Sequence, residues 1–249
     1  YVPKSDTLEI LIRVSNYEHR RGGFWMPMKT GSFKAIQTNF TNQWFISIAV
    51  SGMLFASFLF FLIFYLLDRR DRKLLMFSLL VLCLALRPFL SAPYLITIVD
   101  VRHWHLIIRG EYLILLFMIT SGAWLAYLIY PTRWFRRFAI AIDVIFLFGI
   151  AAIILLPIYL FSYSVWIIQA SAVLVLLYAI FMSIRGVVTG NRIDVLYLIA
   201  FMTIAIGLIS DILFSNALEE NQRLYILSFT MLAFVFIQAT LLIRGWVRR

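Results

Sequence analysis

Five polar side chains lie within long apolar stretches of this sequence, where charged and hydrogen-bonding groups are costly. They are Arg87, Arg109, Glu111, Gln169 and Asp211. A charge at the centre of a bilayer costs at least about 2.5–3.5 kcal/mol on insertion scales, so such residues are functional candidates by default. Groups of these types can pair with one another, and a change of partners can move helices. They therefore indicate a ligand pocket or a conformational switch, or else a set of static contacts between helices.

Seven apolar runs hold these side chains in place. Each run can cross a hydrocarbon core of about 30 Å, which takes roughly 20 helical residues. The runs are continuously apolar and do not alternate, which favours helices over a β-barrel. They are Trp44–Leu67, Leu74–Pro93, Leu106–Ile129, Phe138–Leu156, Val165–Ile184, Val195–Phe214 and Leu224–Ile243. The sequence therefore predicts an all-α membrane protein, a seven-transmembrane helix bundle.

The overall composition agrees with this class. Apolar residues make up 63% of the chain and charged residues only 14%, whereas soluble domains are roughly 45–50% apolar. The surplus apolar surface must face lipid, so the bilayer is the first partner. The net charge of +10 does not indicate nucleic acid, because the cations lie between the apolar runs and not on one aqueous face.

The cations also predict how the bundle is oriented. Twelve of them fall on one side of the predicted bundle, namely Arg69, Arg70, Arg72, Lys73, Arg133, Arg136, Arg137, Arg185, Arg192, Arg244, Arg248 and Arg249. The opposite short loops carry only Arg102 and Arg223. Because cytoplasmic loops are enriched in Lys and Arg, we expect the C-terminus in the cytoplasm and the N-terminus outside. The five polar side chains then share the outer third of the bilayer.

The first 43 residues differ in character from the rest. Leu8–Val14 alternates roughly and is rich in branched residues, which is typical of a strand, and Phe24–Met28 is a second extended piece. Ser32 fits the N-cap of a short amphipathic helix. Two strands cannot form a stable unit alone. We therefore predict the end of an extracytoplasmic β domain and a linker over residues 1–43, and the transmembrane domain over 44–249, in a chain that is part of a longer protein.

Motifs for catalysis, metal binding and cofactor attachment are missing from the sequence. No Lys lies in the seven runs, so a retinal Schiff base has no attachment point. His103 and His105 lack further metal ligands nearby. Phosphate-binding loops and nucleophile elbows are also absent. We expect no enzyme activity, no catalytic residue, no metal and no cofactor.

A second polar pair is also suggested by depth. Asp143 in the fourth run and Gln238 in the seventh lie at similar distances from the cation-rich side. Contact between them is one hypothesis. The alternative is that Asp143 reaches the membrane interface near Arg136 or Arg137.

Several short motifs, in this order and spacing, resemble the bacterial seven-transmembrane receptors with diverse intracellular signalling modules. The motifs are Leu11–Asn16 with Gly22-Gly23 and Gly31, the Asp68–Lys73 cluster, Leu84–Arg87 and Ser210–Leu213. The resemblance implies that residues 1–43 end a jelly-roll sensor domain. It also implies a membrane domain, in the bacterial inner membrane, that relays binding of an extracytoplasmic, carbohydrate-like ligand to a cytoplasmic output module. The rest of the sensor and the output module would lie outside this chain.

A transporter or channel is the competing hypothesis, in which the buried charges would line a substrate path. Against it, the sequence shows no obvious inverted repeat. The sequence leaves the ligand, the output module and the oligomeric state open, and a homodimer is among the options.

Overall fold

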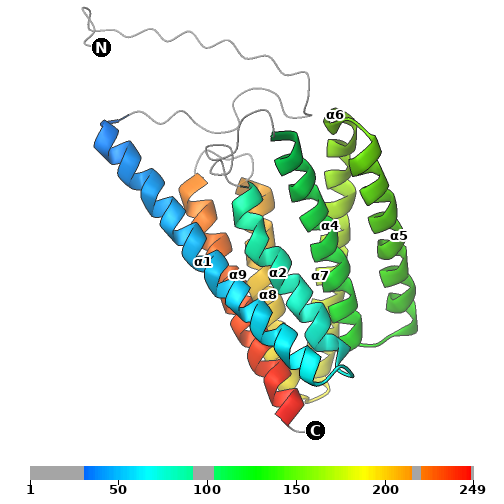
Figure 1. Ribbon diagram of the computed structural model, residues 1–249. Coiled ribbons are helices and arrows are strands. Elements are labelled where there is room, and N and C mark those ends of the chain that lie inside the picture. The colour runs from blue at the N-terminus through cyan, green and yellow to red at the C-terminus, as the bar shows by residue number, and fades with distance from the viewer. Residues whose placement is uncertain (1–30, 92–103, 215–219, 248–249) are drawn as a thin grey trace, which may run out of the picture.

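The computed structural model describes residues 31–91, 104–214 and 220–247. Within them, seven helices are long and apolar enough to cross a membrane. They are α1 (Phe33–Leu67), α2 (Arg72–Ser91), α4 (Trp104–Ile129), α5 (Arg133–Leu155), α7 (Val165–Val188), α8 (Arg192–Phe214) and α9 (Glu220–Val247). The predicted class, an all-helical seven-transmembrane bundle, is confirmed (Figure 1). The strands expected before residue 31 lie outside the described residues.

The first helix is longer than expected. Ser32 is its N-cap, and the Ser32 hydroxyl oxygen accepts from the Ala35 amide at 3.3 Å. The predicted short amphipathic helix and first membrane span are one uninterrupted helix of 35 residues. At a rise of about 1.5 Å per residue, roughly 20 helical residues cross a bilayer core of about 30 Å. The 35 residues of α1 exceed this number. A rigid extension therefore precedes the membrane span.

Six of the helices form a ring. Going around it, α1 packs on α2, α2 on α4, α4 on α7, α7 on α8, α8 on α9, and α9 returns to α1. The fourth span, α5, lies outside this ring and packs on α4 (Figure 1). Two short elements join α5 to α7, namely α6 (Ile158–Phe161) and the 3-10 helix η2 (Ser162–Ser164). The ring order brings the first and last helices into contact.

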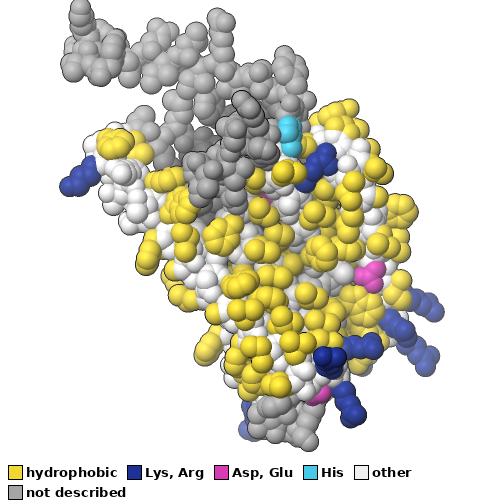
Figure 2. Space-filling model, in the orientation of Figure 1, with side chains coloured by type: hydrophobic (Ala, Val, Ile, Leu, Met, Phe, Trp, Pro, Cys, Tyr) yellow, Lys and Arg dark blue, Asp and Glu magenta, His cyan; other side chains and the backbone are white. Residues whose placement is uncertain are grey.

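Large apolar side chains cover the outside of the bundle. Figure 2 shows a surface that is mostly hydrophobic along the length of the helices. On α5, Leu147, Phe148 and Leu155 are 65%, 73% and 79% exposed. Such exposure in water would be unfavourable, whereas lipid is an equivalent solvent for these groups. The surface is that of a membrane-embedded domain.

A buried aromatic path links α1, α2 and α9. Phe61 of α1 meets Phe77 of α2 edge-on, with ring centroids 4.8 Å apart. Phe77 in turn meets Phe234 of α9 at 6.4 Å. All three side chains are at most 3% exposed. Edge-to-face pairs of this kind contribute about 0.5–1.5 kcal/mol beyond the area that they bury.

Exposed cations gather at the end of the bundle where the chain terminates, which we call the C-terminal side (Figure 2). Three connections lie there, over residues 68–71, 130–132 and 189–191. Ten described Lys and Arg residues belong to these connections and the adjoining helix ends, namely Arg69, Arg70, Arg72, Lys73, Arg133, Arg136, Arg137, Arg185, Arg192 and Arg244. The opposite end is called the N-terminal side below.

Candidate functional site

The five polar residues predicted from sequence come from four helices and lie near the N-terminal side. Arg87 is in the last turns of α2, Arg109 and Glu111 in the first turns of α4, and Gln169 near the start of α7. Each of these four side chains is half-buried. Asp211 belongs to the last turn of α8, and its side chain lies outside the described residues. Pairing of Asp211 with an arginine therefore stays a prediction.

Arg109 fastens the connection between α5 and α7. Its guanidinium donates to the carbonyl oxygens of Ile154 at 3.4 Å and Leu156 at 3.2 Å, which are among the last carbonyls of α5. A cation at a helix C-terminus satisfies orphan carbonyls and complements the helix dipole. The same guanidinium lies 5.4 Å from the ring centroid of Phe161. These contacts give Arg109 a role in positioning the α5–α7 connection.

Tyr112, one turn further along α4, is a second side chain that contacts the α5–α7 connection. Its hydroxyl donates to the Ser162 carbonyl at 3.1 Å, and its ring meets Phe161 edge-on at 5.2 Å. Sequence inspection missed Tyr112, because a lone tyrosine in an apolar run is indistinguishable from a packing residue.

The hypothesis that Asp143 pairs with Gln238 is wrong. The indole N–H of Trp124 on α4 lies 3.1 Å from both carboxylate oxygens of Asp143 on α5. Gln238 is fully buried, and neither polar atom of its side chain has a hydrogen-bond partner among the described residues. Trp124 is thus a hydrogen-bond donor between two helices. The contact could not be foreseen because residue depth does not reveal which helices are neighbours.

A hydrogen-bonded cluster on the C-terminal side is the most developed polar site among the described residues. The Tyr130 hydroxyl donates to Asp194 Oδ1 at 2.7 Å and lies 3.0 Å from Ser183 Oγ. Asp194 is only 6% exposed and Ser183 is fully buried. Because Tyr130 has a single proton, which goes to Asp194, the Ser183 proton must serve Tyr130 Oη or the Ala179 carbonyl at 2.8 Å. The site joins the end of α4 to α7 and α8.

The Asp194 carboxylate packs so closely against Gly186 that no side chain fits at position 186. A Cβ placed at Gly186 on α7 would collide with the Asp194 carboxylate.

Burial raises the pKa of the Tyr130 phenol above its usual range. The phenol is therefore protonated at neutral pH and serves Asp194 as a donor.

A chain of hydrogen bonds links the Tyr130 backbone to Tyr178 on α7 and to Thr132 at the start of α5. The Tyr178 hydroxyl donates to the Tyr130 carbonyl at 2.7 Å and lies 2.9 Å from Thr132 Oγ1. Since the Tyr178 proton is used, Thr132 is the donor in the second contact. Thr132 also caps α5 by accepting from the Phe135 amide at 3.3 Å, and the Phe135 and Tyr178 rings stack at 3.6 Å. The start of α5 is thereby tied to α7.

A second buried carboxylate lies on the same side of the bundle. Asp71 is 6% exposed and accepts from the Lys73 amide at 3.1 Å at the start of α2. Asp71 and Asp194 both lie near the Tyr197 phenol, and the Tyr197 ring meets that of Tyr130 edge-on at 6.0 Å. We call Asp71, Tyr130, Ser183, Asp194 and Tyr197 the carboxylate cluster. It brings together residues from or beside all three connections of the C-terminal side.

This cluster escaped sequence inspection. Asp71 and Asp194 stand beside arginines in predicted loops, where charges are usually solvated. The available signal was that an acidic residue recurs at the start of two helices on a side otherwise rich in cations. No group of three or more His, Cys, Asp or Glu side chains able to hold a metal occurs in the described part of the chain. The hydrogen bonds of the cluster join the end of α4 to α7 and α8.

The fold and its polar sites define a multi-pass membrane protein of the seven-helix class, with a polar cluster at the cation-rich end. A family model described as 7TM diverse intracellular signalling matches residues 43–244. The chain belongs to this family of seven-transmembrane signalling receptors, as its sequence motifs predicted. No curated protein and no solved structure shows a significant match.

Proposed function

We propose that this chain is the membrane domain of a bacterial signal-transduction receptor in the inner membrane. It relays ligand binding at an extracytoplasmic sensor, with a carbohydrate-like ligand, to a signalling module in the cytoplasm. Membership of the signalling family, over residues 43–244, supports the general role. The direction and the route of the relay are argued from geometry.

One observation carries the proposed route: the helix that enters the bundle packs against the helix that leaves it. α1 is continuous from its extension to the C-terminal side, and it contacts α9 directly. Through Phe77, the Phe61 ring of α1 is also linked to Phe234 of α9. A rotation or shift of α1 therefore acts on α9 without passing around the ring. Small helix shifts of this kind are a common form of transmembrane switching.

The carboxylate cluster lies on the side of the bundle where such a helix shift would act on the cytoplasmic module. It lies at the ends of α2, α4, α7 and α8 on the C-terminal side, and its two carboxylates stand beside cations in the sequence that would face the cytoplasm. The Tyr130 hydroxyl is joined to Ser183 and Asp194 by hydrogen bonds. One such bond can be exchanged for another at small net cost as long as the buried carboxylate keeps a donor, which suits a two-state contact.

The predicted charges of the N-terminal side would complete the relay. We propose that Asp211 pairs with Arg87 or Arg109, since an unpaired carboxylate there would be costly. A switch role predicts altered basal output for Asp211→Asn at normal expression, with partial recovery in a charge-swapped double mutant. Unchanged stability and output would remove Asp211 from the relay.

A transporter is less consistent with the interior. A cavity inside the described bundle is lined by apolar side chains and a single charged residue, Arg87. Ion and substrate paths need polar groups along their length. A lining of this kind does not offer such a path.

The orientation can be tested with single cysteines. Phe33, at the start of α1, is 82% exposed and Trp134, at the start of α5, is 69% exposed. The native Cys83 is buried, so its background labelling should be low. In intact cells, an impermeant maleimide should label Phe33→Cys and miss Trp134→Cys until the membrane is permeabilised. Labelling of Trp134→Cys alone in intact cells would reverse the orientation and the direction of the relay.

A further inference from the structure

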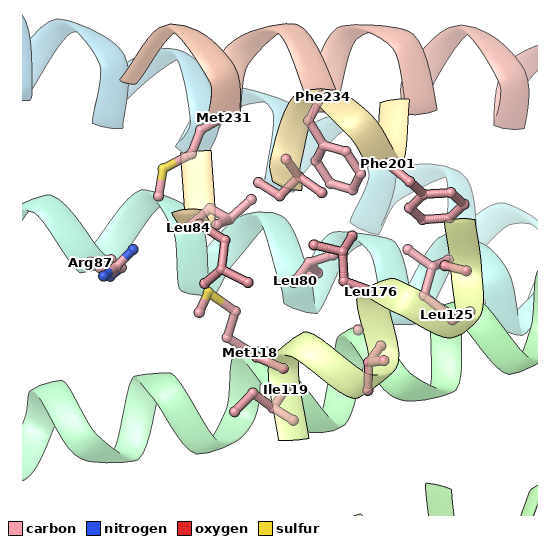
Figure 3. A pocket seen from close by; sticks show the side chains of 17 residues that line it. Leu80, Leu84, Arg87, Met118, Ile119, Leu125, Leu176, Phe201, Met231 and Phe234 are labelled. Carbon is pink, nitrogen blue, oxygen red and sulfur yellow. The ribbon is translucent and has the colours of Figure 1, made fainter. Parts of the chain in front are cut away.

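A cavity of about 120 Å³ lies inside the ring, between α2, α4, α7, α8 and α9. Its walls are aliphatic and aromatic over most of their length. Figure 3 shows Arg87 at one end, beyond Leu84, Met118 and Met231, with Leu125 and Phe201 at the other end. Apart from Arg87, every lining residue is apolar. The cavity is thus a narrow apolar space with a positive charge at one end.

Gly122 gives independent evidence that the space is open. This glycine lines the cavity from α4, and a Cβ placed on it would meet no atom within 4 Å. By contrast, a Cβ at Gly149 of α5 would lie 2.7 Å from Leu116 Cδ1. Helices that meet through glycine normally use the saved space for close packing. At Gly122 the saved space is left unfilled.

The size and lining of the cavity restrict what it can hold. An apolar cavity of about 150 Å³ stays dry and takes up benzene, so 120 Å³ corresponds by proportion to about five carbon atoms. The thioethers of Met118 and Met231 are adaptable walls, because methionine fills irregular space with little strain. A guanidinium matches the geometry of a carboxylate and can donate two parallel hydrogen bonds to it.

We propose that the bundle binds a short-chain carboxylate in this cavity, with a chain of about five carbons between Met118, Leu176 and Phe234. Its carboxylate accepts from Arg87, whose five N–H donors can serve Asp211 and a ligand at the same time. Phe234 belongs both to this wall and to the aromatic path to α1. Binding would therefore touch the side chain that connects α9 to α2. The binding itself does not depend on the proposed relay and can be measured without any signalling output.

The test uses the purified chain in phosphatidylcholine nanodiscs and radiolabelled hexanoate, with empty nanodiscs as background. Unlabelled butyrate, hexanoate, octanoate and decanoate compete for the label. Partition into lipid rises about fourfold with each methylene, so simple partition predicts decanoate as the strongest competitor. A cavity of fixed length predicts saturable binding with a maximum near hexanoate and weaker competition by decanoate. A monotonic rise with chain length would overturn the proposal.

Two matched pairs of variants separate the cavity from the charge. Gly122→Leu fills the cavity and should abolish saturable binding, whereas Gly122→Ala should keep it. Arg87→Gln should weaken hexanoate about tenfold or more, as loss of a charge-assisted hydrogen bond implies, while leaving competition by the uncharged 1-hexanol unchanged. Arg87→Lys keeps the charge and should retain part of the affinity. Equal hexanoate binding by the native chain and Gly122→Leu would contradict the assignment.

A bilayer lipid could supply the same anion and chain. Replacing phosphatidylcholine by phosphatidylglycerol tests this source. If hexanoate binding is unchanged, the free carboxylate is the occupant. If phosphatidylglycerol suppresses hexanoate binding in the native chain, and also stabilises that chain but not Gly122→Leu, the cavity belongs to lipid and the proposal is wrong.

Discussion

Replacing Phe77 by alanine is expected to lower the free energy of unfolding by about 2–3 kcal/mol. Phe→Ala in a soluble core costs about 3–5 kcal/mol. Part of that cost is absent in a membrane, because the side chain stays in lipid when the helices separate. The cavity that remains would interrupt the path from Phe61 to Phe234, both of which contact the Phe77 ring. Denaturation of the purified chain by SDS, from mixed micelles, measures the loss.

Phe236→Ala on α9 is the matched control. Phe236 is 75% exposed, whereas Phe77 is fully buried. A lipid-facing residue should change stability by less than about 0.5 kcal/mol. If both substitutions lower the free energy of unfolding by the same amount, burial does not decide how much a phenylalanine stabilises this bundle. The aromatic path then has no special role. In the complete receptor, Phe77→Ala should also weaken the response to ligand more than Phe77→Leu does.

Tyr130→Phe is expected to cost about 1.5–3 kcal/mol, the range for a hydrogen bond to a charged group. The substitution removes only the hydroxyl that donates to Asp194 at 2.7 Å. It leaves the rings of Tyr130 and Tyr197 in contact. The buried carboxylate then loses a donor that water cannot easily replace, since Asp194 is 6% exposed. The same SDS titration reports the change.

A double-mutant cycle identifies the source of this effect. In an Asp194→Asn background the cost of Tyr130→Phe should shrink by at least about 0.5 kcal/mol, because the removed hydroxyl no longer serves a carboxylate. Tyr163→Phe, at a position 60% exposed, should be nearly neutral. Additive effects of Tyr130→Phe and Asp194→Asn would mean that the two side chains do not cooperate.

Much of this architecture follows from hydrophobic patterning. The seven apolar runs correspond to seven helices, and Ser32 was predicted as an N-cap, because both depend on residues close together in the sequence. The length of α1 was missed because the polar residues Lys34, Thr38 and Asn42 lie before the apolar run, although they belong to the same helix. Polar residues fall outside a hydropathy run, yet they continue a helix that is already nucleated.

The candidate site was harder to foresee than the fold. Arg87, Arg109 and Asp211 stand out in sequence because charges are rare in apolar runs. Asp194 and Tyr130 do not, because they lie at helix ends, where charges and tyrosines are usual. Their contact depends on the ring order, which places α4 beside α7 and α7 beside α8. Hydropathy carries no information on which helices are neighbours.

The most direct test of the relay changes the rotational phase of α1 in the complete receptor. Alanines inserted between Asn39 and Phe40 lengthen the extension ahead of the membrane span. Two alanines rotate the preceding part by about 200°, and seven rotate it by about 700°, close to two full turns. A rigid α1 that drives α9 predicts that two alanines abolish or invert the response to ligand and that seven largely restore it. A flexible Gly-Ser insert of seven residues should not restore it. Equal responses for all three inserts would contradict the account, because α1 would then transmit no rotation to the cytoplasmic side.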